Sequence, residues 1–258
     1  MRIWYQSMTC LDDSGRYAQT ISDTALRLFR GSAEISVEGI ERSTYFGHVP
    51  GEVFKYPLLK SLVQRRSVDA ALAAERQGYD AFIIGSFSEP FLKETRGAVN
   101  IPVASLAESA FTTAWSLTER FALITLSPAY ARRLRDLTHR HGLQSRLGGA
   151  YALDSSYMER HATAALGDPT ELLDKFEQTA HKAISDGADL IIPAEGILNQ
   201  IVAESGLNEV EGAIVMDSVA VCLLHTQMLV DIKSKLGISH ARKFSYPVPP
   251  NDMLEKFT

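Results

Sequence analysis

This 258-residue chain is constrained most by a regular alternation of amphipathic segments with short apolar runs. Residues 18–30 place apolar side chains at helical spacing, and residues 34–41 then alternate as a strand does. After a further helical segment, Asp80–Ser86 contains a continuous apolar run, which is typical of a parallel strand covered on both faces. The alternation of helices with buried strands predicts an α/β fold with parallel sheets.

The same pattern continues along the chain. Further strands are expected at residues 2–6, 101–103, 120–126, 189–193 and 213–216. Further helices are expected at residues 57–77, 105–117, 128–140, 169–186 and 218–235. Residues 44–56 contain two glycines and a proline and are expected to form a loop.

Composition and charge argue against several classes of function. The formal net charge of −5 does not suit a protein that binds nucleic acid through a basic face. No segment approaches the roughly 18 apolar residues of a membrane span. One local group of basic residues is expected to be a solvated helix face: Arg132, Arg133, Arg135 and Arg140.

The N-terminal residues lack the apolar core of a signal peptide, and two cysteines are too few for a disulfide framework. Both features predict a cytoplasmic protein. His139 and His141 have poor spacing for a metal on one helix face, and no glycine-rich nucleotide motif is present. We therefore expect no metal and no cofactor, and a small-molecule substrate rather than a nucleic acid or a membrane as the partner.

The chain contains an internal repeat. Gly78–Ser86 and Gly187–Glu195 both read Gly-x-Asp, then an apolar strand, then a polar residue, and they are 109 residues apart (187 − 78 and 195 − 86). The repeat predicts two pseudo-symmetric lobes that face each other across a cleft, with Ser86 and Glu195 approaching one ligand from opposite sides. The alternative is that helix–glycine–strand units recur in any α/β protein, since so short a match is weak alone.

The expected lobes each contain a central parallel sheet flanked by helices. Lobe 1 comprises residues 1–103 and 218–258, and lobe 2 comprises residues 104–217. Ligands of such sheets bind beyond the carboxyl ends of the strands, so the active site is expected in the cleft between the lobes.

Several segments resemble the aspartate/glutamate/hydantoin racemase superfamily, and within it hydantoin racemases. The best segments are Gly78–Leu92, Pro102–Phe111, Gly187–Gly196 and Val215–Tyr246. The first loop, Gln6–Thr9, differs from the Asn-Pro-Asn type of loop that such families usually carry there. The resemblance implies two lobes, cofactor-independent chemistry on a small molecule, and a homo-oligomer.

The resemblance also implies one catalytic cysteine from each lobe, one for each face of the substrate carbon. Ser86 and Glu195 occupy these two positions, so the cysteine-pair mechanism does not carry over intact. A serine does not ionise usefully without an activating base, whereas a partly buried glutamate can exchange protons near neutral pH. We predict Glu195 as the general acid/base and Ser86 as a nucleophile, hydrogen-bond donor or relay opposite it.

Both residues also have a structural interpretation. Ser86 is followed three residues later by Glu89, as in a capping box, and Glu195 could accept hydrogen bonds at a helix N-terminus. The peptide N–H groups after Ser86 and Glu195 are expected to begin helices and to hold a carboxylate or an enolate.

The predicted substrate-binding residues lie at strand ends or beside the catalytic pair: Ser7, Thr9, Phe87, Thr125, Ser127, Gly196 and Asp217. Turn formation is the alternative for the hydroxyl residues, and helix capping is the alternative for Asp217. Cys10 follows the first strand, where a small buried residue is the simpler interpretation.

The sequence leaves three functions open. The first is an isomerase or racemase that works next to a carbonyl of a hydantoin-like or amino-acid-like compound. The second is a lyase such as a decarboxylase, or a hydrolase, that acts on a small carboxylate or cyclic amide. The third is a small-ligand-binding protein without turnover. Because a protic residue stands at each of the two positions, we favour an enzyme.

Overall fold

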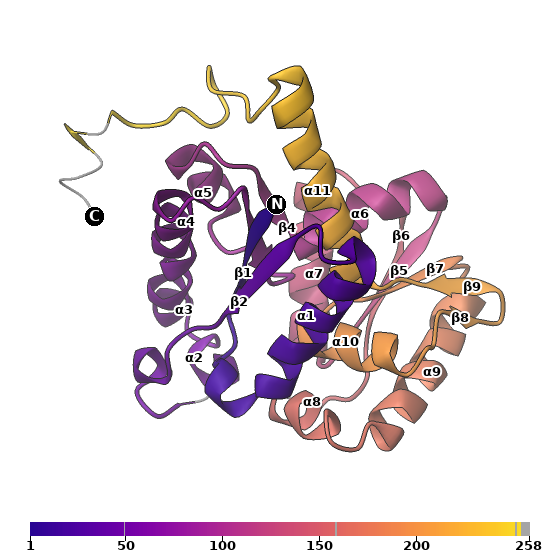
Figure 1. Cartoon of the computed structure of the whole chain (residues 1–258). Coiled ribbons are helices and arrows are strands. Elements are labelled where there is room, and N and C mark those ends of the chain that lie inside the picture. Colours follow the sequence, from indigo (N-terminus) through magenta and orange to yellow (C-terminus); the bar gives the residue numbers. More distant parts are fainter. Residues whose placement is uncertain (49, 158, 251, 254–258) are drawn as a thin grey trace.

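The computed structural model describes residues 1–48, 50–157, 159–250 and 252–253, which fold around two β-sheets (Figure 1). The first sheet has the order β2-β1-β3-β4, and its strands are all parallel. Its strands are β1 (Arg2–Ser7), β2 (Glu34–Glu38), β3 (Ala81–Gly85) and β4 (Val103–Ser105).

The second sheet has the order β6-β5-β7-β9-β8 and is parallel except for β8, which runs antiparallel to β9. Its strands are β5 (Phe121–Thr125), β6 (Leu147–Ala152), β7 (Leu190–Pro193), β8 (Glu209–Val210) and β9 (Ala213–Val215). The order β6-β5-β7-β9 repeats the order β2-β1-β3-β4, and the two copies of the Gly-x-Asp repeat contain β3 and β7. The expected α/β fold with two parallel-dominated sheets is confirmed.

Helices flank both sheets. Those of the N-terminal half are α1 (Gly15–Phe29), α2 (Pro50–Val53), α3 (Pro57–Gln64), α4 (Arg66–Arg76), α5 (Leu92–Ala98) and α6 (Leu106–Leu117), with 3₁₀ turns at Leu11–Asp13 and Arg42–Tyr45. Those of the C-terminal half are α7 (Pro128–Arg140), α8 (Glu159–Ala165), α9 (Thr170–Ser185), α10 (Gly196–Glu204) and α11 (Ser218–Leu236).

Strand β3 is apolar throughout because helices cover both of its faces. Phe82 and Ile84 pack in a cluster with residues of α4, whereas Ile83 belongs to the main hydrophobic core on the other face. This alternation follows from the two-residue period of a strand. All three side chains are fully buried. Their packing fixes the carboxyl end of β3, which Ser86 follows.

The main core is continuous between the two sheets. It joins Ile3 and Tyr5 of β1 with Phe121 and Leu123 of β5, and α1, α6 and α11 pack in the same region (Figure 1). Helix α11 contacts α6 as well as β3 and β4. The assignment of residues 1–103 and 218–258 to lobe 1, and of 104–217 to lobe 2, remains a proposal.

Three expectations about elements are corrected. The helix expected over residues 57–77 is divided at Arg65 into α3 and α4. The loop expected over residues 44–56 contains α2 and part of a 3₁₀ turn. The strand expected at residues 101–103 begins only at Val103, after Pro102, which has no N–H to donate.

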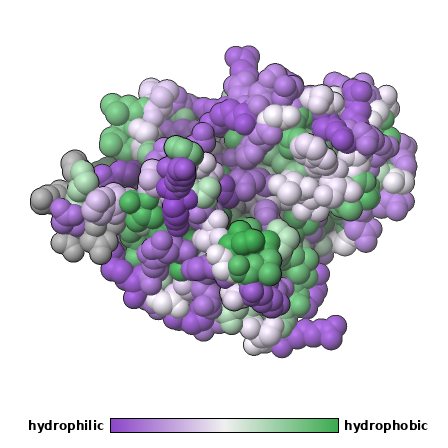
Figure 2. Space-filling model, turned by 90° about the horizontal axis from the view of Figure 1, so that it is seen from above, coloured by the Kyte–Doolittle hydropathy of each residue, from purple (hydrophilic) through white to green (hydrophobic). Residues whose placement is uncertain are grey.

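The surface is mixed in polarity. In Figure 2, hydrophilic residues cover much of the face seen from above, and hydrophobic residues appear on it in separate groups. None of the helices within the described residues is long and apolar enough to cross a bilayer.

Candidate active site

A cleft with a volume of about 230 Å³ lies at the carboxyl ends of the central strands. Four polar side chains mark this edge: Ser7 ends β1, Ser86 follows β3, Ser127 follows β5 by two residues, and Glu195 follows β7 by two residues. Ser86 and Glu195, from the matching positions of the repeat, therefore line the same cleft.

Glu195 is both a cleft residue and a helix cap. Its carboxylate accepts a hydrogen bond from the N–H of Leu198 at 2.9 Å, and this bond satisfies a donor that the first turn of α10 leaves unpaired. The side chain is half-buried. The carboxylate is thus held at a fixed position where α10 begins.

Ser86 lies on a turn, not at the start of a helix. Its hydroxyl is 3.0 Å from the hydroxyl of Ser88, which in turn accepts a hydrogen bond from the amide of Gln64 at 3.1 Å. The next helix, α5, begins only at Leu92. The expectations that Ser86 caps a helix, and that a helix N-terminus follows it, are therefore wrong.

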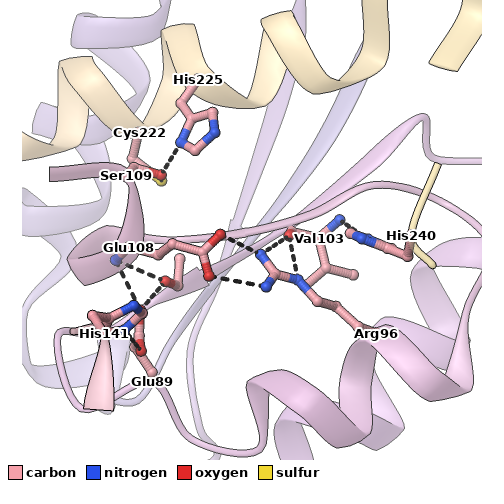
Figure 3. Close-up of polar contacts among 10 residues, drawn as sticks. Glu89, Arg96, Val103, Glu108, Ser109, His141, Cys222, His225 and His240 are labelled. Atoms are coloured by element: carbon pink, nitrogen blue, oxygen red, sulfur yellow. Dashed lines mark hydrogen bonds and ion pairs between the residues drawn. The ribbon is translucent and has the colours of Figure 1, made fainter. Parts of the chain in front are cut away.

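Glu89 has a different partner from the one that a capping box predicts. Its carboxylate accepts hydrogen bonds from the Ser105 hydroxyl and, at 2.8 Å, from the N–H of Glu108, so it caps α6 from another part of the chain. Its second oxygen lies 2.7 Å from Nε2 of His141 (Figure 3). This contact anchors the turn that follows Ser86.

A tyrosine packs against each of the glycines beside the candidate pair. A Cβ atom on Gly196 would lie 2.3 Å from the hydroxyl oxygen of Tyr17, and one on Gly85 would lie 2.3 Å from Cε1 of Tyr5. The two phenol oxygens are 3.3 Å apart. Burial, together with Tyr17, raises the pKa of Tyr5 well above its ordinary value of 10.0, so this phenol stays neutral.

The remaining predicted residues divide into two groups. Ser7, Thr9, Phe87, Ser127 and Gly196 line the cleft. Thr125 and Asp217 lie outside the lining. The hydroxyl of Thr125 is buried and has no hydrogen-bond partner within the described part of the chain.

Asp217 acts as the N-cap of α11. Its carboxylate accepts hydrogen bonds from the N–H of Ala220 at 3.0 Å and from the amide of Asn199 at 3.1 Å, and it forms an ion pair with Arg27 at 3.4 Å. Cys10 is also outside the lining, buried in a small cluster with Met8 and neighbouring apolar residues. No group of three or more potential metal ligands occurs among the described residues.

The cleft also has residues that sequence reasoning missed. They are aromatic or basic for the most part: Tyr17, Phe54, Lys55, Lys60, Gln64, Ser88, Tyr130, Arg133 and Tyr157. Arg133 belongs to the stretch expected to be a plain solvated face, and it is exposed, yet it stands at the cleft. The sequence did contain a signal for Arg133: it lies in the first turns of a helix that begins beside Ser127, at the carboxyl ends of the strands.

Two sheets with the same strand order line one cleft at their strand ends, which is where α/β enzymes bind small molecules. The sequence model described as Asp/Glu/hydantoin racemase matches residues 58–221. The chain therefore belongs to this racemase family of enzymes.

Individual relatives agree with the family. A hydantoin racemase of Pseudomonas sp. (strain NS671) is 26% identical over 174 residues, which cover 67% of this chain and 66% of that protein. The fold is similar to that of an allantoin racemase from Klebsiella pneumoniae, with a TM-score of 0.74 and 21% identity over 97% of this chain and 94% of that one. It is also similar to arylmalonate decarboxylase, with a TM-score of 0.54 and 15% identity over 89% and 92% of the respective chains.

Proposed function

We propose that this protein catalyses cofactor-independent acid–base chemistry at a carbon next to a carbonyl group. The substrate is a small hydantoin-like or amino-acid-like molecule, Glu195 is the general acid/base, and Ser86 faces it. The observation that carries the proposal is that Ser86 and Glu195, from matching positions of the repeat, line one cleft. The similarity to hydantoin and allantoin racemases supports the same reaction type.

In the proposed reaction, the Glu195 carboxylate removes the proton from the substrate carbon, and negative charge develops on the adjacent carbonyl oxygen. N–H groups at the start of α10 and the hydroxyls of Ser86 and Ser127 are available donors for this charge. Protonation of the carbon then completes the reaction. A half-buried site strengthens such donors because less water screens them.

Ser86 acts as a donor or relay in this proposal. Its hydroxyl is linked through Ser88 to the neutral amide of Gln64, and no hydrogen bond to a basic side chain is present in the described part of the chain. Without such a base a serine does not become an effective proton acceptor. For inversion, the Ser86 hydroxyl gives its proton to the second face of the carbon and takes another from solvent water, while Glu195 releases the abstracted proton to solvent.

Decarboxylation is the second candidate. Only one of the two paired positions, that of Glu195, carries an ionisable side chain. Loss of carbon dioxide generates a carbanion that needs a proton on one face only, so a single acid suffices. The fold similarity to arylmalonate decarboxylase is compatible with this candidate but carries only the fold.

The test is incubation of the protein in deuterium oxide with a panel of enantiopure hydantoins. We expect deuterium to replace the proton at the chiral carbon and the optical rotation to be lost. Proton NMR measures the exchange. Carbon dioxide release from substituted malonates, without exchange on hydantoins, would instead establish the decarboxylase candidate.

Glu195→Gln is the decisive variant. The Gln oxygen can still accept the hydrogen bond of Leu198, so we expect the fold to be retained while exchange falls by at least about a thousandfold. Circular dichroism and thermal unfolding check the fold. Exchange at the wild-type rate in a folded variant would remove Glu195 from the mechanism.

A further inference from the structure

A basic wall extends from the cleft into a second cavity. Lys60 of α3 and Arg133 of α7 line the cleft, and both also line a neighbouring cavity with a volume of about 380 Å³. Arg140, two turns further along α7, lines this second cavity. Ser88 and Phe87 line both cavities, so the two spaces are neighbours beside the turn that carries Ser86.

The three cations lie close to one another, and the described part of the chain supplies no ion-pair partner to any of them. No ion pair joins Lys60, Arg133 or Arg140 to a carboxylate among the described residues. The carboxylate residue Asp136 also lines the second cavity, but among the described residues it forms no ion pair with any of the three cations. Arg133 donates one hydrogen bond, to the carbonyl of Phe54 at 3.3 Å.

The charges act on each other. Burial lowers the pKa of Lys60, and the positive charges of Arg133 and Arg140 lower it further. Three like charges around one cavity repel, and an anion placed between them would relieve this repulsion and form charge-assisted hydrogen bonds. The cavity therefore has the chemistry of an anion site.

The position of the cavity indicates which anion it serves. The hydroxyl of Ser88 lies 3.0 Å from that of Ser86, and Ser88 also lines the second cavity together with the basic wall. The second cavity is therefore next to the place where a substrate carbon held between Ser86 and Glu195 would carry its side chain. A site for a free anion would not have to lie beside Ser86 and Glu195, so this position favours an anionic group that belongs to the substrate.

We propose that the cavity formed by Lys60, Arg133 and Arg140 binds a carboxylate on the side chain of the substrate, so that the substrate is a hydantoin or related compound with an anionic side chain. This inference rests on the proposed function for the location of the reacting carbon. The anion site itself is defined by the three cations and the second cavity.

The experiment compares the hydantoin derived from glutamate with the hydantoin derived from glutamine, which has an uncharged amide of the same shape. Calorimetric binding and steady-state kinetics are measured separately on the full chain. We expect the glutamate-derived compound to bind at least about tenfold more tightly and to have the lower KM. Arg133→Gln combined with Arg140→Gln should remove this preference, so that the two compounds bind with equal affinity.

Arg132→Gln is the matched control, because Arg132 is an exposed neighbour on α7 that lines neither cavity. It should keep the preference. Selective binding that depends on Arg133 and Arg140, without turnover of either compound, would support the anion site and count against the proposed function. Turnover of both compounds with equal KM would overturn the anion site alone. Failure of both compounds to bind would overturn the anion site and count against the proposed function as well.

Inorganic phosphate serves as the third probe. The proposal is supported by two results together. Phosphate competes with the glutamate-derived hydantoin for the wild-type protein, and it does not compete with the glutamine-derived hydantoin for the double variant. If phosphate binds through Arg133 and Arg140 while the two hydantoins bind equally well, the cavity takes a free anion, and a role in holding the substrate side chain is overturned.

Discussion

At the scale of single residues, the glycines beside Ser86 and Glu195 are required by the tyrosines that pack on them. Gly196→Ala would place a methyl group 2.3 Å from the Tyr17 hydroxyl oxygen, and the next atom, Cζ, is 3.2 Å away. We expect Gly196→Ala to destabilise the fold by about 2 kcal/mol, as overpacking does, and Tyr17→Phe to restore most of that loss by removing the oxygen. Urea unfolding of both variants measures the effect.

Gly85 provides the control for this prediction. A methyl group there would meet the ring carbons Cε1 and Cζ of Tyr5 at 2.3 and 2.5 Å, and phenylalanine keeps both of these atoms. Tyr5→Phe should therefore fail to rescue Gly85→Ala. Equal rescue at the two positions would show that the hydroxyl contact at Gly196 is not the cause.

Ser86 and Glu195 together predict the effect of a thiol at the serine position. A cysteine thiol ionises with a pKa of about 8.5, so in the proposed mechanism Ser86→Cys adds a second acid/base on the face opposite Glu195. We expect the rate of racemisation to rise at least about tenfold, with a new ionisation in the pH profile of kcat. Ser127→Cys also places a thiol on the cleft, away from the repeated position, and should give no increase.

The residues of the site were predictable where the repeat or a strand end marked them. Ser86 and Glu195 stand out because a fixed offset and a strand end select them. Tyr17 and Lys60 do not, because each lies within a helix whose periodicity explains it without a ligand. Their role depends on which helix face meets the other lobe, and this is a property of packing that a single sequence does not carry.

At the scale of elements, the turn after Ser86 depends on a partly buried carboxylate–imidazole contact (Figure 3). Burial alone would lower the pKa of His141, but the hydrogen bond and the charge of Glu89 raise it overall. Because the folded-state pKa lies above the unfolded value of about 6.5, the charged contact stabilises the fold fully below that pH and is lost as the pH rises. We expect about 1 kcal/mol of stability to disappear on the alkaline side of pH 6.5.

His141→Gln tests this contact. The variant should be less stable than the wild type at pH 6 and should lose less stability as the pH is raised to 8.5, as measured by urea unfolding at each pH. His139→Gln, an exposed change on the same helix, should follow the wild-type curve. Parallel curves for the wild type and His141→Gln would exclude the contact as a source of the pH dependence.

The strands and long helices were predicted well because each carries its own periodicity, and the exceptions have local causes. Strand β6 was missed because Gly148 and Gly149 are unfavourable in strands. Gly149 is needed there, since a methyl group on it would lie 2.6 Å from the Tyr151 ring, whereas one on Gly148 would lie 3.1 Å from Nε of the flexible Arg120 side chain. The division between α3 and α4 was missed because residues on both sides of Arg65 keep helical spacing.

At the scale of the whole molecule, the cleft depends on contacts that tie the two sheets together. The hydroxyl of Thr20 on α1 accepts a hydrogen bond from the amide of Gln200 on α10 at 2.9 Å, and both side chains are buried. This bond lies next to the Tyr17–Gly196 contact on the same two helices. The positions of Ser86 and Glu195 relative to each other are thus set by lobe packing, which the repeat alone does not determine.

The segment after α11 is also tied to the first sheet, and its histidine gives the molecule a second pH dependence. Nε2 of His240 accepts a hydrogen bond from the N–H of Val103 at 3.1 Å, which requires the neutral ring. Burial, together with the charges of Arg96 and Arg242, lowers the pKa of His240 to about 4. The unfolded state binds this proton near pH 6.5, so stability falls as the pH drops from about 6.5 to 4, opposite in direction to the effect of His141.

We therefore expect the stability of the wild-type protein to be greatest near neutral pH and to decline on both sides, with separate residues responsible for each side. His240→Gln should reduce the decline between pH 6.5 and 4 by an amount that cannot exceed about 1.4 kcal/mol per pH unit, and it should leave the alkaline side unchanged. His141→Gln should do the reverse. The test is to measure the free energy of unfolding of the wild type and both variants from acid to alkaline pH. If the His240→Gln curve runs parallel to that of the wild type below pH 6.5, the C-terminal segment does not couple protonation to folding.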